Sequence, residues 1–233
     1  MNESTLLKRG ELMYEANATK PYTGGVFELY DNGEKVFDGS YKDGIKHGDW
    51  TYYTEVSGGQ YDVTYTAGTY TVAVFTDNSG TNYTGSPTTD DSNQDGTYLY
   101  RQEDKYNFSK FPKFFATIKD EEGDGKWTEW YENGQKKAEV TYKDGKQDGL
   151  STEWYENGQK KEEVTYKDGE PDGVRTRWYE NGQKEEEITY KDGKLDGSAL
   201  GWYENGQKWG EATFKDGELI KETRWDKNGN LIE

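Results

Sequence analysis

The heptapeptide Trp-Tyr-Glu-Asn-Gly-Gln-Lys decides the fold of this chain, and it occurs four times, starting at Trp130, Trp154, Trp178 and Trp202. Successive copies begin 24 residues apart. A second element, Tyr-Lys-Asp-Gly, follows at Tyr142, Tyr166 and Tyr190, with a phenylalanine version at Phe214. Self-similarity at a fixed period of this length is typical of repeat proteins, in which each unit buries its apolar surface against its neighbours.

One repeat carries the signals of a β-hairpin. Residues 150–156 are a strand candidate, Asn157-Gly158 is a turn, and residues 159–166 are a second strand candidate. Asn-Gly between two such runs is the strongest short-range hairpin signal, because both residues tolerate positive φ. An isolated hairpin is marginal in water, so the hairpins should stack edge to edge. The sequence therefore predicts an all-β fold, an elongated single-layer antiparallel sheet of tandem 24-residue β-hairpin repeats.

The type of turn decides which side chains share a face of the sheet. A three-residue turn with a bulge places Trp154, Val164 and Tyr166 together, opposite Lys161 and Glu163. A two-residue turn shifts the pairing by one residue and moves Trp154 to the other face. We favour the three-residue turn, because it separates aliphatic from charged positions.

The repeats predict five parts of the chain. These are an N-terminal capping segment at 1–25, repeats at 26–53, diverged repeats with a long polar loop (76–96) at 54–115, regular repeats at 116–221, and a C-terminal partial hairpin at 222–233. The segment from Asp62 to Gly68 is a degenerate copy of the segment from Glu139 to Gly145. The loop is rich in Asn, Ser, Thr, Gly and Asp, which favour turns.

The amino-acid composition and net charge limit the classes of partner that the chain is expected to bind. The chain has 233 residues, only 30% hydrophobic residues and a net charge of −17, yet it holds 8 Trp, 20 Tyr and 8 Phe. These aromatic residues supply the apolar surface and favour strands. The acidic charge repels nucleic acid and anionic membrane surfaces, so direct binding to either is not expected. It attracts basic proteins.

The residues for catalysis are missing from the sequence. There is no cysteine, and His47, the single histidine, takes the turn position that Asp148 holds in the regular repeats. We therefore expect no enzyme activity and no catalytic residue, since a general base needs a nucleophile or partner beside it. No signal peptide or transmembrane segment is recognisable, so a cytoplasmic location is the default expectation, or a secreted or surface location if a signal was removed.

One local motif points to a metal. Asp91, Asn93 and Asp95, followed by Gly96, match the start of a calcium-binding loop. The twelfth position is Gln102 instead of a carboxylate, and no helices flank the segment. A calcium site and an ordinary polar loop are the two readings, and we favour the polar loop. No other cofactor is expected.

Aromatic residues that recur once per repeat are the candidate partner-binding residues. They are Tyr131, Tyr155, Tyr179, Tyr203, Trp130, Trp154, Trp178 and Trp202. Exposed rings on a rigid sheet are good anchors for a partner. The same rings also suit cross-strand packing, which we favour for the tyrosines because each hairpin needs such contacts to stack.

The W-Y-E-N-G and Y-K-D-G-x-x-D-G elements resemble those of the bacterial MORN-variant repeat proteins, many of which are described as antitoxin components of toxin–antitoxin systems. The opening segment, with Leu7-Lys8-Arg9-Gly10 and Pro21-Tyr22-Thr23-Gly24, is similar to the start of those proteins. The resemblance implies an elongated antiparallel sheet of MORN-like hairpins and contact with another protein.

Three functions follow as hypotheses. The first is a non-catalytic scaffold for protein–protein interaction, with antitoxin-like binding of a basic partner. The second is a structural subunit that self-assembles through open β-edges into a filament or surface layer, with Trp225, Leu231 and Ile232 at the assembling edge. The third is a calcium-dependent carbohydrate- or surface-binding module. The expected partner is a protein, either basic or another copy of the chain.

Overall fold

The computed structural model of the chain describes residues 1–54, 58–70, 73–77, 79–88, 96–100, 114–119 and 122–232. In these residues the protein is a β structure of tandem antiparallel hairpins, which confirms the predicted fold class. No helix in this part of the chain is long and apolar enough to cross a membrane. The chain divides into two compact units.

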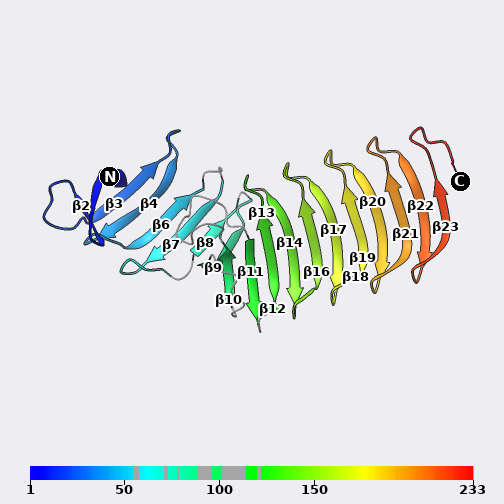
Figure 1. Cartoon of the computed structure of the whole chain (residues 1–233), viewed down its shortest axis with the longest axis horizontal. Helices are drawn as coiled ribbons and strands as arrows, with labels where there is room; N and C mark the ends of the chain where they lie inside the picture. The colour runs from blue at the N-terminus through cyan, green and yellow to red at the C-terminus, as the bar shows by residue number, and fades with distance from the viewer. Residues whose placement is uncertain are drawn as a thin grey trace. The chain divides into compact units, whose positions relative to one another are not determined.

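Unit 1 comprises residues 1–92, 96–115 and 132–134. Its elements are the 3₁₀ turn η1 (Glu3–Thr5) and the strands β1 (Leu6–Arg9), β2 (Leu12–Glu15), β3 (Gly24–Leu29), β4 (Lys35–Lys42), β5 (Ile45–Lys46), β6 (Gly48–Tyr53), β7 (Gln60–Tyr65), β8 (Ala73–Thr76), β9 (Asn82–Thr88) and β10 (Gly96–Tyr100). From β3 to β9 neighbouring strands are antiparallel, β10 lies parallel to β9, and β1–β2 form a separate hairpin (Figure 1).

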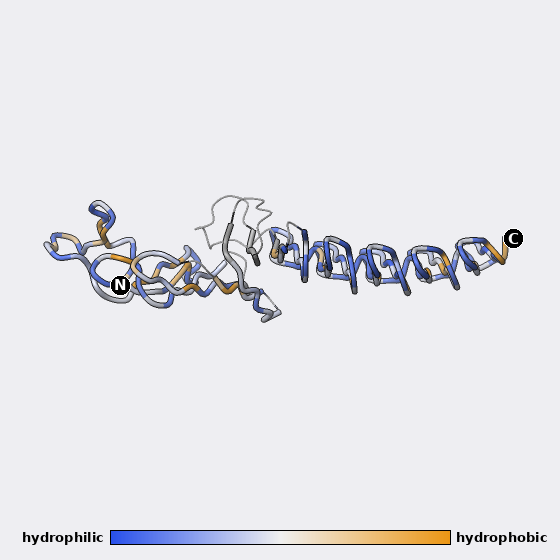
Figure 2. The backbone as a smooth tube through the Cα atoms, turned by 90° about the horizontal axis from the view of Figure 1, so that it is seen from below, coloured by the Kyte–Doolittle hydropathy of each residue, from blue (hydrophilic) through white to orange (hydrophobic). Residues whose placement is uncertain are grey.

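Unit 2 holds the regular repeats and comprises residues 93–95, 116–131 and 135–233. Its strands are β11 (Phe114–Lys119, which begins at the boundary), β12 (Glu122–Gly123), β13 (Gly125–Trp130), β14 (Lys136–Lys143), β15 (Lys146–Gln147), β16 (Gly149–Trp154), β17 (Lys160–Lys167), β18 (Glu170–Pro171), β19 (Gly173–Trp178), β20 (Lys184–Lys191), β21 (Lys194–Trp202), β22 (Lys208–Lys215) and β23 (Glu218–Arg224). Seen along its strands, unit 2 is a single thin row of hairpins whose backbone trace is mostly hydrophilic (Figure 2).

Two glycine-containing turns alternate along unit 2. At one end of the strands, Gly158 donates its N–H to the Tyr155 carbonyl at 2.9 Å with a φ of 82°. This is the predicted three-residue turn closed by a glycine with positive φ. At the other end, Asp168 and Gly169 have φ values of 51° and 90°. Two successive positive φ angles make the tight turn that matches the twist of the flanking strands, which explains why Asp-Gly recurs there.

The prediction that Trp154 shares a face of the sheet with Val164 and Tyr166 is wrong. In the hairpin of β16 and β17, Glu153 pairs with Glu162 and Trp154 pairs with Lys160, so that Lys161 is left out of the ladder. This second bulge shifts the pairing by one residue and reverses every side chain beyond it. Val164 therefore lies opposite Trp154 on the other face of the sheet, together with Ser151, its cross-strand neighbour.

The predicted polar loop at 76–96 is also wrong in part, because residues 82–88 form strand β9, which pairs antiparallel with β8. The turn between the two strands is organised by Asp77, which is 3% exposed. Its carboxylate accepts hydrogen bonds from the backbone N–H groups of Ser79 and Thr81. It also accepts one from the Tyr83 hydroxyl. A buried, fully engaged carboxylate explains how a polar segment can hold a tight turn.

The N-terminal residues complete the outer side of strand β3. The backbone N–H of Phe27 donates to the Met1 carbonyl at 2.9 Å, and Asn2 and Phe27 form a parallel bridge. The adjoining η1 turn places Glu3 against the hydroxyl of Tyr41. The edge of the sheet at β3 is thus paired, which removes one surface on which a foreign strand could add.

Candidate functional site

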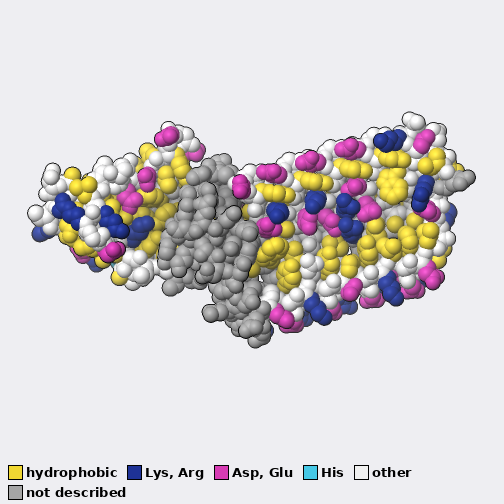
Figure 3. Space-filling view, viewed as in Figure 1, with side chains coloured by type: hydrophobic (Ala, Val, Ile, Leu, Met, Phe, Trp, Pro, Cys, Tyr) yellow, Lys and Arg dark blue, Asp and Glu magenta, His cyan; other side chains and the backbone are white. Residues whose placement is uncertain are grey.

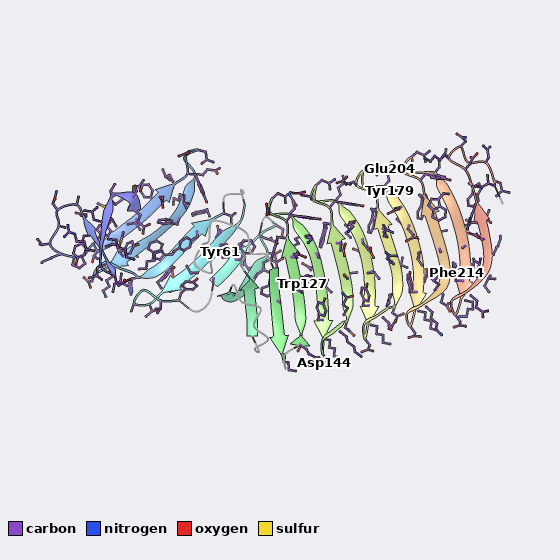
Figure 4. The ribbon with its side chains drawn as sticks, viewed as in Figure 1. Tyr61, Trp127, Asp144, Tyr179, Glu204 and Phe214 are labelled. Carbon is purple, nitrogen blue, oxygen red and sulfur yellow. The ribbon has the colours of Figure 1, made fainter. Side chains whose placement is uncertain are left out.

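Two faces of unit 2 carry different side chains, and each recurs along the repeats. We call the face that holds Val140, Tyr142, Val164 and Tyr166 the valine face, and the face that holds Trp130, Trp154, Trp178 and Trp202 the tryptophan face. In Figure 4, Asp144 and Glu204 lie at opposite ends of the strands of unit 2, and Trp127 and Phe214 lie on the strands.

The tyrosine row closes the gaps between neighbouring hairpins. The Tyr155 hydroxyl donates to the Trp178 carbonyl of the next hairpin at 2.8 Å, and Tyr179 donates to the Trp202 carbonyl at 2.8 Å. Tyr131 and Tyr203 repeat the contact at 2.9 Å and 3.0 Å. Partial burial raises the pKa of Tyr155 and of Tyr179. These contacts are the packing role that the sequence favoured, while a role of the tyrosines in binding stays a prediction.

The tryptophan face is covered by the chain's own lysines. The ammonium group of Lys160 lies 5.7 Å from the centre of the Trp178 ring, and that of Lys184 lies 5.9 Å from the Trp202 ring. The same lysines form ion pairs with glutamates three residues further along the chain, Glu163 in the case of Lys160. The indoles of Trp178 and Trp202 are therefore already in contact with a cation, a favourable arrangement for an aromatic ring.

The valine face is hollowed. A groove of about 340 Å³ crosses the first two hairpins of unit 2, and Trp127, Tyr142 and Tyr166 are among its lining residues. Val140 and Val164, 5% and 4% exposed, also line it. A concave, aromatic-lined surface with charged residues beside it is the usual form of a binding site.

Cross-strand ion pairs flank the groove at one recurring position. Lys137 contacts Glu129 at 2.8 Å, and Lys161 contacts Glu153 at 3.0 Å. In the third hairpin the charges are exchanged, because Arg177 contacts Glu185 at 3.4 Å. In the fourth hairpin the pair is Gly201 and Trp209, and the indole lies over the glycine. The bulge residue and the residue across from it therefore change together from repeat to repeat.

Arg175 links two hairpins on the valine face. It donates two hydrogen bonds to Glu162, of 2.6 Å and 3.2 Å, and lies 3.5 Å from Glu186. The hydrogen bonds to Glu162 raise the pKa of the Arg175 guanidinium. A two-bonded arginine–carboxylate pair fixes geometry as well as charge. One wall residue of the groove, Glu162, is thus held by an arginine of the next hairpin.

Acidic side chains mark both ends of the strands in unit 2. Glu156, Glu180 and Glu204 are exposed at the three-residue turns, and Asp144 and Asp168 are exposed at the Asp-Gly turns. Figure 3 shows hydrophobic side chains in bands across the sheet of unit 2, with acidic and basic side chains between and beside them. Negative charge therefore lies at both ends of the strands that carry the groove.

Four segments of this sheet match a known family, the MORN repeat variant, at residues 123–144, 147–168, 171–192 and 195–216. Residues 123–216 carry four MORN repeats. MORN repeats are in general non-enzymatic modules of protein or membrane interaction. The comparison with curated proteins matched none.

In unit 1 the equivalent face is filled with aromatic rings. Lys46 lies among them, 4.2 Å from the centre of the Trp50 ring and 2.8 Å from the Tyr52 hydroxyl oxygen, to which it donates. The Tyr52 and Tyr65 hydroxyls are 3.1 Å apart. Burial lowers the pKa of Lys46 and raises the pKa of Tyr52. A hollow of about 620 Å³ adjoins Lys46 and is also lined by Glu3 and Tyr41.

The remaining predicted site residues lie elsewhere. Asp91, Asn93 and Asp95 fall outside the described residues, and the described residues hold no cluster of carboxylates or histidine suited to a metal ion. Calcium binding therefore stays a prediction. Trp225 and Leu231 form a bridge at the outer edge of β23, and Ile232 donates its N–H to the Arg224 carbonyl at 2.9 Å. Leu231 and Ile232 are 66% and 54% exposed.

Sequence reasoning missed the ion pairs on the valine face. The signal is present in the MORN repeats, because the position two residues after each recurring glutamine is Lys137, Lys161, Glu185 or Trp209. The residue before each repeat tryptophan changes in step with it. Positions that vary together are usually in contact. A comparison of the repeats with one another would have shown this pairing.

Proposed function

We propose that the chain is a non-catalytic scaffold that binds a basic protein on the valine face of its MORN repeats, in the way that an antitoxin masks its partner. The observation that carries the proposal is the difference between the two faces. The tryptophan face is occupied by the lysines of the chain itself. The valine face offers a groove with aromatic walls and acidic rims.

Charge complementarity supports a basic partner. The net charge of −17 speeds the encounter with a positive protein, while the apolar lining of the groove supplies contact area once the two have met. The ion pairs beside the groove are close to neutral as pairs, so they set orientation more than overall attraction. The exposed acidic side chains at the turns of both rims provide the attraction.

Two lysines of the first hairpin make a matched test. Lys137 belongs to the valine face and Lys126 to the tryptophan face, and each side chain is 46% exposed. The chain has no cysteine, so Lys137→Cys and Lys126→Cys each create a single attachment point for a photo-crosslinker. Both labelled proteins would be irradiated in a lysate of the source cells, and captured proteins identified by mass spectrometry.

We expect the label at position 137 to capture one basic protein that the label at position 126 does not. Equal capture from both faces would remove the assignment to the valine face. Capture of only acidic proteins, or of nothing at either position, would overturn the proposal of a basic partner.

Assembly into a filament or surface layer is the second candidate function, and the exposed aliphatic residues at the C-terminal edge favour it. Leu219 and Ile220 of β23 are 53% and 63% exposed, and Leu231 and Ile232 lie beside the same edge. Light scattering combined with small-angle X-ray scattering tests it on the purified chain. A species that grows with concentration would support assembly, and a monomer at all concentrations would exclude it under those conditions.

A further inference from the structure

The fourth MORN repeat breaks the pattern of ion pairs on the valine face. Where the first two repeats hold a glutamate and a lysine, this repeat holds Gly201 and Trp209. A Cβ atom at position 201 would lie 2.2 Å from Cε2 of the Trp209 ring. Only glycine leaves room for the ring, so the two substitutions act as one change from a charged pair to an indole lying on backbone.

Trp209 is unusually exposed for a tryptophan of this protein. It is 38% exposed, whereas Trp130 is 5% exposed and Trp50 is fully buried. A large aromatic side chain that stays in solvent loses the free energy that its burial would provide. Exposed tryptophans are also the residues most enriched at the energetic centres of protein interfaces.

The half-buried indoles of the protein show which neighbour such a ring takes. Trp178, Trp202 and Trp225 each have a lysine ammonium 5.7–5.9 Å from the ring centre. Among the described residues, no lysine or arginine lies over the Trp209 ring in this way. Trp209 thus has the chemistry of the other indoles but lacks their cation.

Carboxylates lie on the valine face of both strands that flank the hairpin of β21 and β22, which carries Trp209. Glu186 of β20 is the cross-strand neighbour of Gly201, on which the ring lies. On the other side, Glu222 of β23 shares the valine face and contacts Arg224 at 2.6 Å. The arginines of β19 also already hold carboxylates, since Arg177 contacts Glu185 at 3.4 Å and Arg175 lies 3.5 Å from Glu186. The surroundings of the indole are therefore suited to a cation that comes from outside the chain.

We propose that Trp209 binds an arginine side chain of the partner. The guanidinium group of this arginine stacks on the indole, and the neighbouring glutamates accept hydrogen bonds from its N–H groups. This inference rests on the proposed binding of a basic protein to the valine face. A guanidinium fits better than an ammonium, because it is planar, stacks on aromatic rings and offers several donors at its edge.

The experiment measures binding of fluorescein-labelled nona-arginine to the full chain by fluorescence anisotropy at low salt. Nona-lysine and nona-glutamate are the comparison peptides, and the variants are Trp209→Ala and Trp209→Phe. Val174→Ala is the matched control, because Val174 is 49% exposed and lies on the tryptophan face. Circular dichroism would show that every variant keeps its β structure.

We expect Trp209→Ala to weaken nona-arginine binding by roughly two- to fivefold, the range for a cation on an exposed ring. Trp209→Phe should keep part of the affinity for nona-arginine, and Val174→Ala should leave that affinity unchanged. Trp209→Ala should lower the affinity for nona-lysine less than the affinity for nona-arginine. Equal affinity of the unaltered chain and Trp209→Ala for nona-arginine would overturn the role of Trp209 and leave the proposed function standing.

Failure of the proposed function has a different signature. If the unaltered chain binds nona-arginine no better than nona-glutamate, the affinity for basic partners itself is refuted, whatever Trp209 does. Equal losses for nona-arginine and nona-lysine in Trp209→Ala would refute the guanidinium preference. A change in tryptophan fluorescence on adding cello-oligosaccharides, absent in Trp209→Ala, would assign the ring to a sugar and overturn the proposal.

Discussion

The two units of the molecule share one backbone plan and differ in what they place on it. Asp43-Gly44 of unit 1 has φ values of 52° and 81°, and Asp168-Gly169 of unit 2 has 51° and 90°. The Tyr30 hydroxyl of unit 1 donates to the Tyr53 carbonyl at 3.2 Å, as each repeat tyrosine of unit 2 does to the next hairpin. The turns and the clamps between hairpins are thus common to both units.

The faces of the two sheets differ. In unit 1, Trp50 lies 5.4 Å from the ring of Tyr41 and 5.5 Å from the ring of Phe37, and it is fully buried. In unit 2 the corresponding face is interrupted by ion pairs such as Glu153–Lys161. The ladder depends on turns and backbone hydrogen bonds, so the side chains of one face are free to serve either as a packed core or as a surface for a partner.

The largest expected effect is the loss of Trp50. Trp50→Ala should destabilise unit 1 by about 3–5 kcal/mol, because it removes a fully buried indole from a packed ring cluster. Trp209→Ala should change stability by less than ~1 kcal/mol, because that ring is already 38% exposed. Urea unfolding followed by circular dichroism measures both. Similar losses for the two variants would mean that the two faces are packed alike.

The next effect concerns the pH dependence of unit 1. The pKa of Lys46 in the folded protein is lowered from 10.5 by burial. Between the lowered pKa and 10.5 the unfolded chain binds more protons than the folded chain, so stability rises with pH, by at most about 1.4 kcal/mol per pH unit. The comparison of the unaltered chain with Lys46→Met isolates this contribution.

The measurement for Lys46 is urea unfolding from neutral pH to about pH 9, where a tyrosine with an ordinary pKa near 10 is still mostly protonated in the unfolded chain. We expect the free energy of unfolding of the unaltered chain to rise relative to that of Lys46→Met. Parallel curves would show that the rings around Lys46 stabilise its ammonium form enough to cancel the effect of burial.

Ala67 offers a smaller and more local comparison. It has a φ of 49° in unit 1, at the position that Asp144 occupies in unit 2 with a φ of 48°. Asp tolerates positive φ better than Ala does. Ala67→Asp should therefore stabilise unit 1 by roughly 0.5–1 kcal/mol, and Asp144→Ala should destabilise unit 2 by a similar amount. Thermal unfolding checks the pair, and equal signs for the two changes would contradict the shared turn.

The sequence predicted the parts of the fold that depend on local signals. The hairpin turn at Gly158 follows from Asn-Gly, although Asn-Gly alone does not decide between a two-residue and a three-residue turn. The turn at Ala67-Gly68 follows from alignment with the Asp-Gly turns. The bulge at Lys161 could not be predicted, because a bulge residue carries no composition of its own and its position depends on the partner strand. Since one bulge reverses a face, the error at a single residue misplaced Trp154.

The candidate site was less predictable than the fold. The tyrosines were recognised as recurring residues, but their hydroxyl contacts across 23 residues depend on how hairpins stack. The groove depends on which side chains meet at neighbouring strands, and therefore on the same bulge. The strand at 82–88 was missed because its stability comes from pairing with β8 and from the buried Asp77, not from an alternating pattern.

The smallest expected effect tests whether binding on the valine face depends on the order of the two charges in an ion pair or only on their balance. Exchanging the pair in the double variant Glu153→Lys, Lys161→Glu copies the order of Arg177 and Glu185 in the next repeat. Each single change should cost about 0.2–1 kcal/mol, because it places like charges across the strands, and the double variant should recover the loss. A double-mutant cycle by urea unfolding measures the coupling. If the double variant keeps its stability but no longer binds the partner captured at position 137, the order of the two charges specifies the partner. If it keeps both its stability and the partner, only the balance of charge matters at this position.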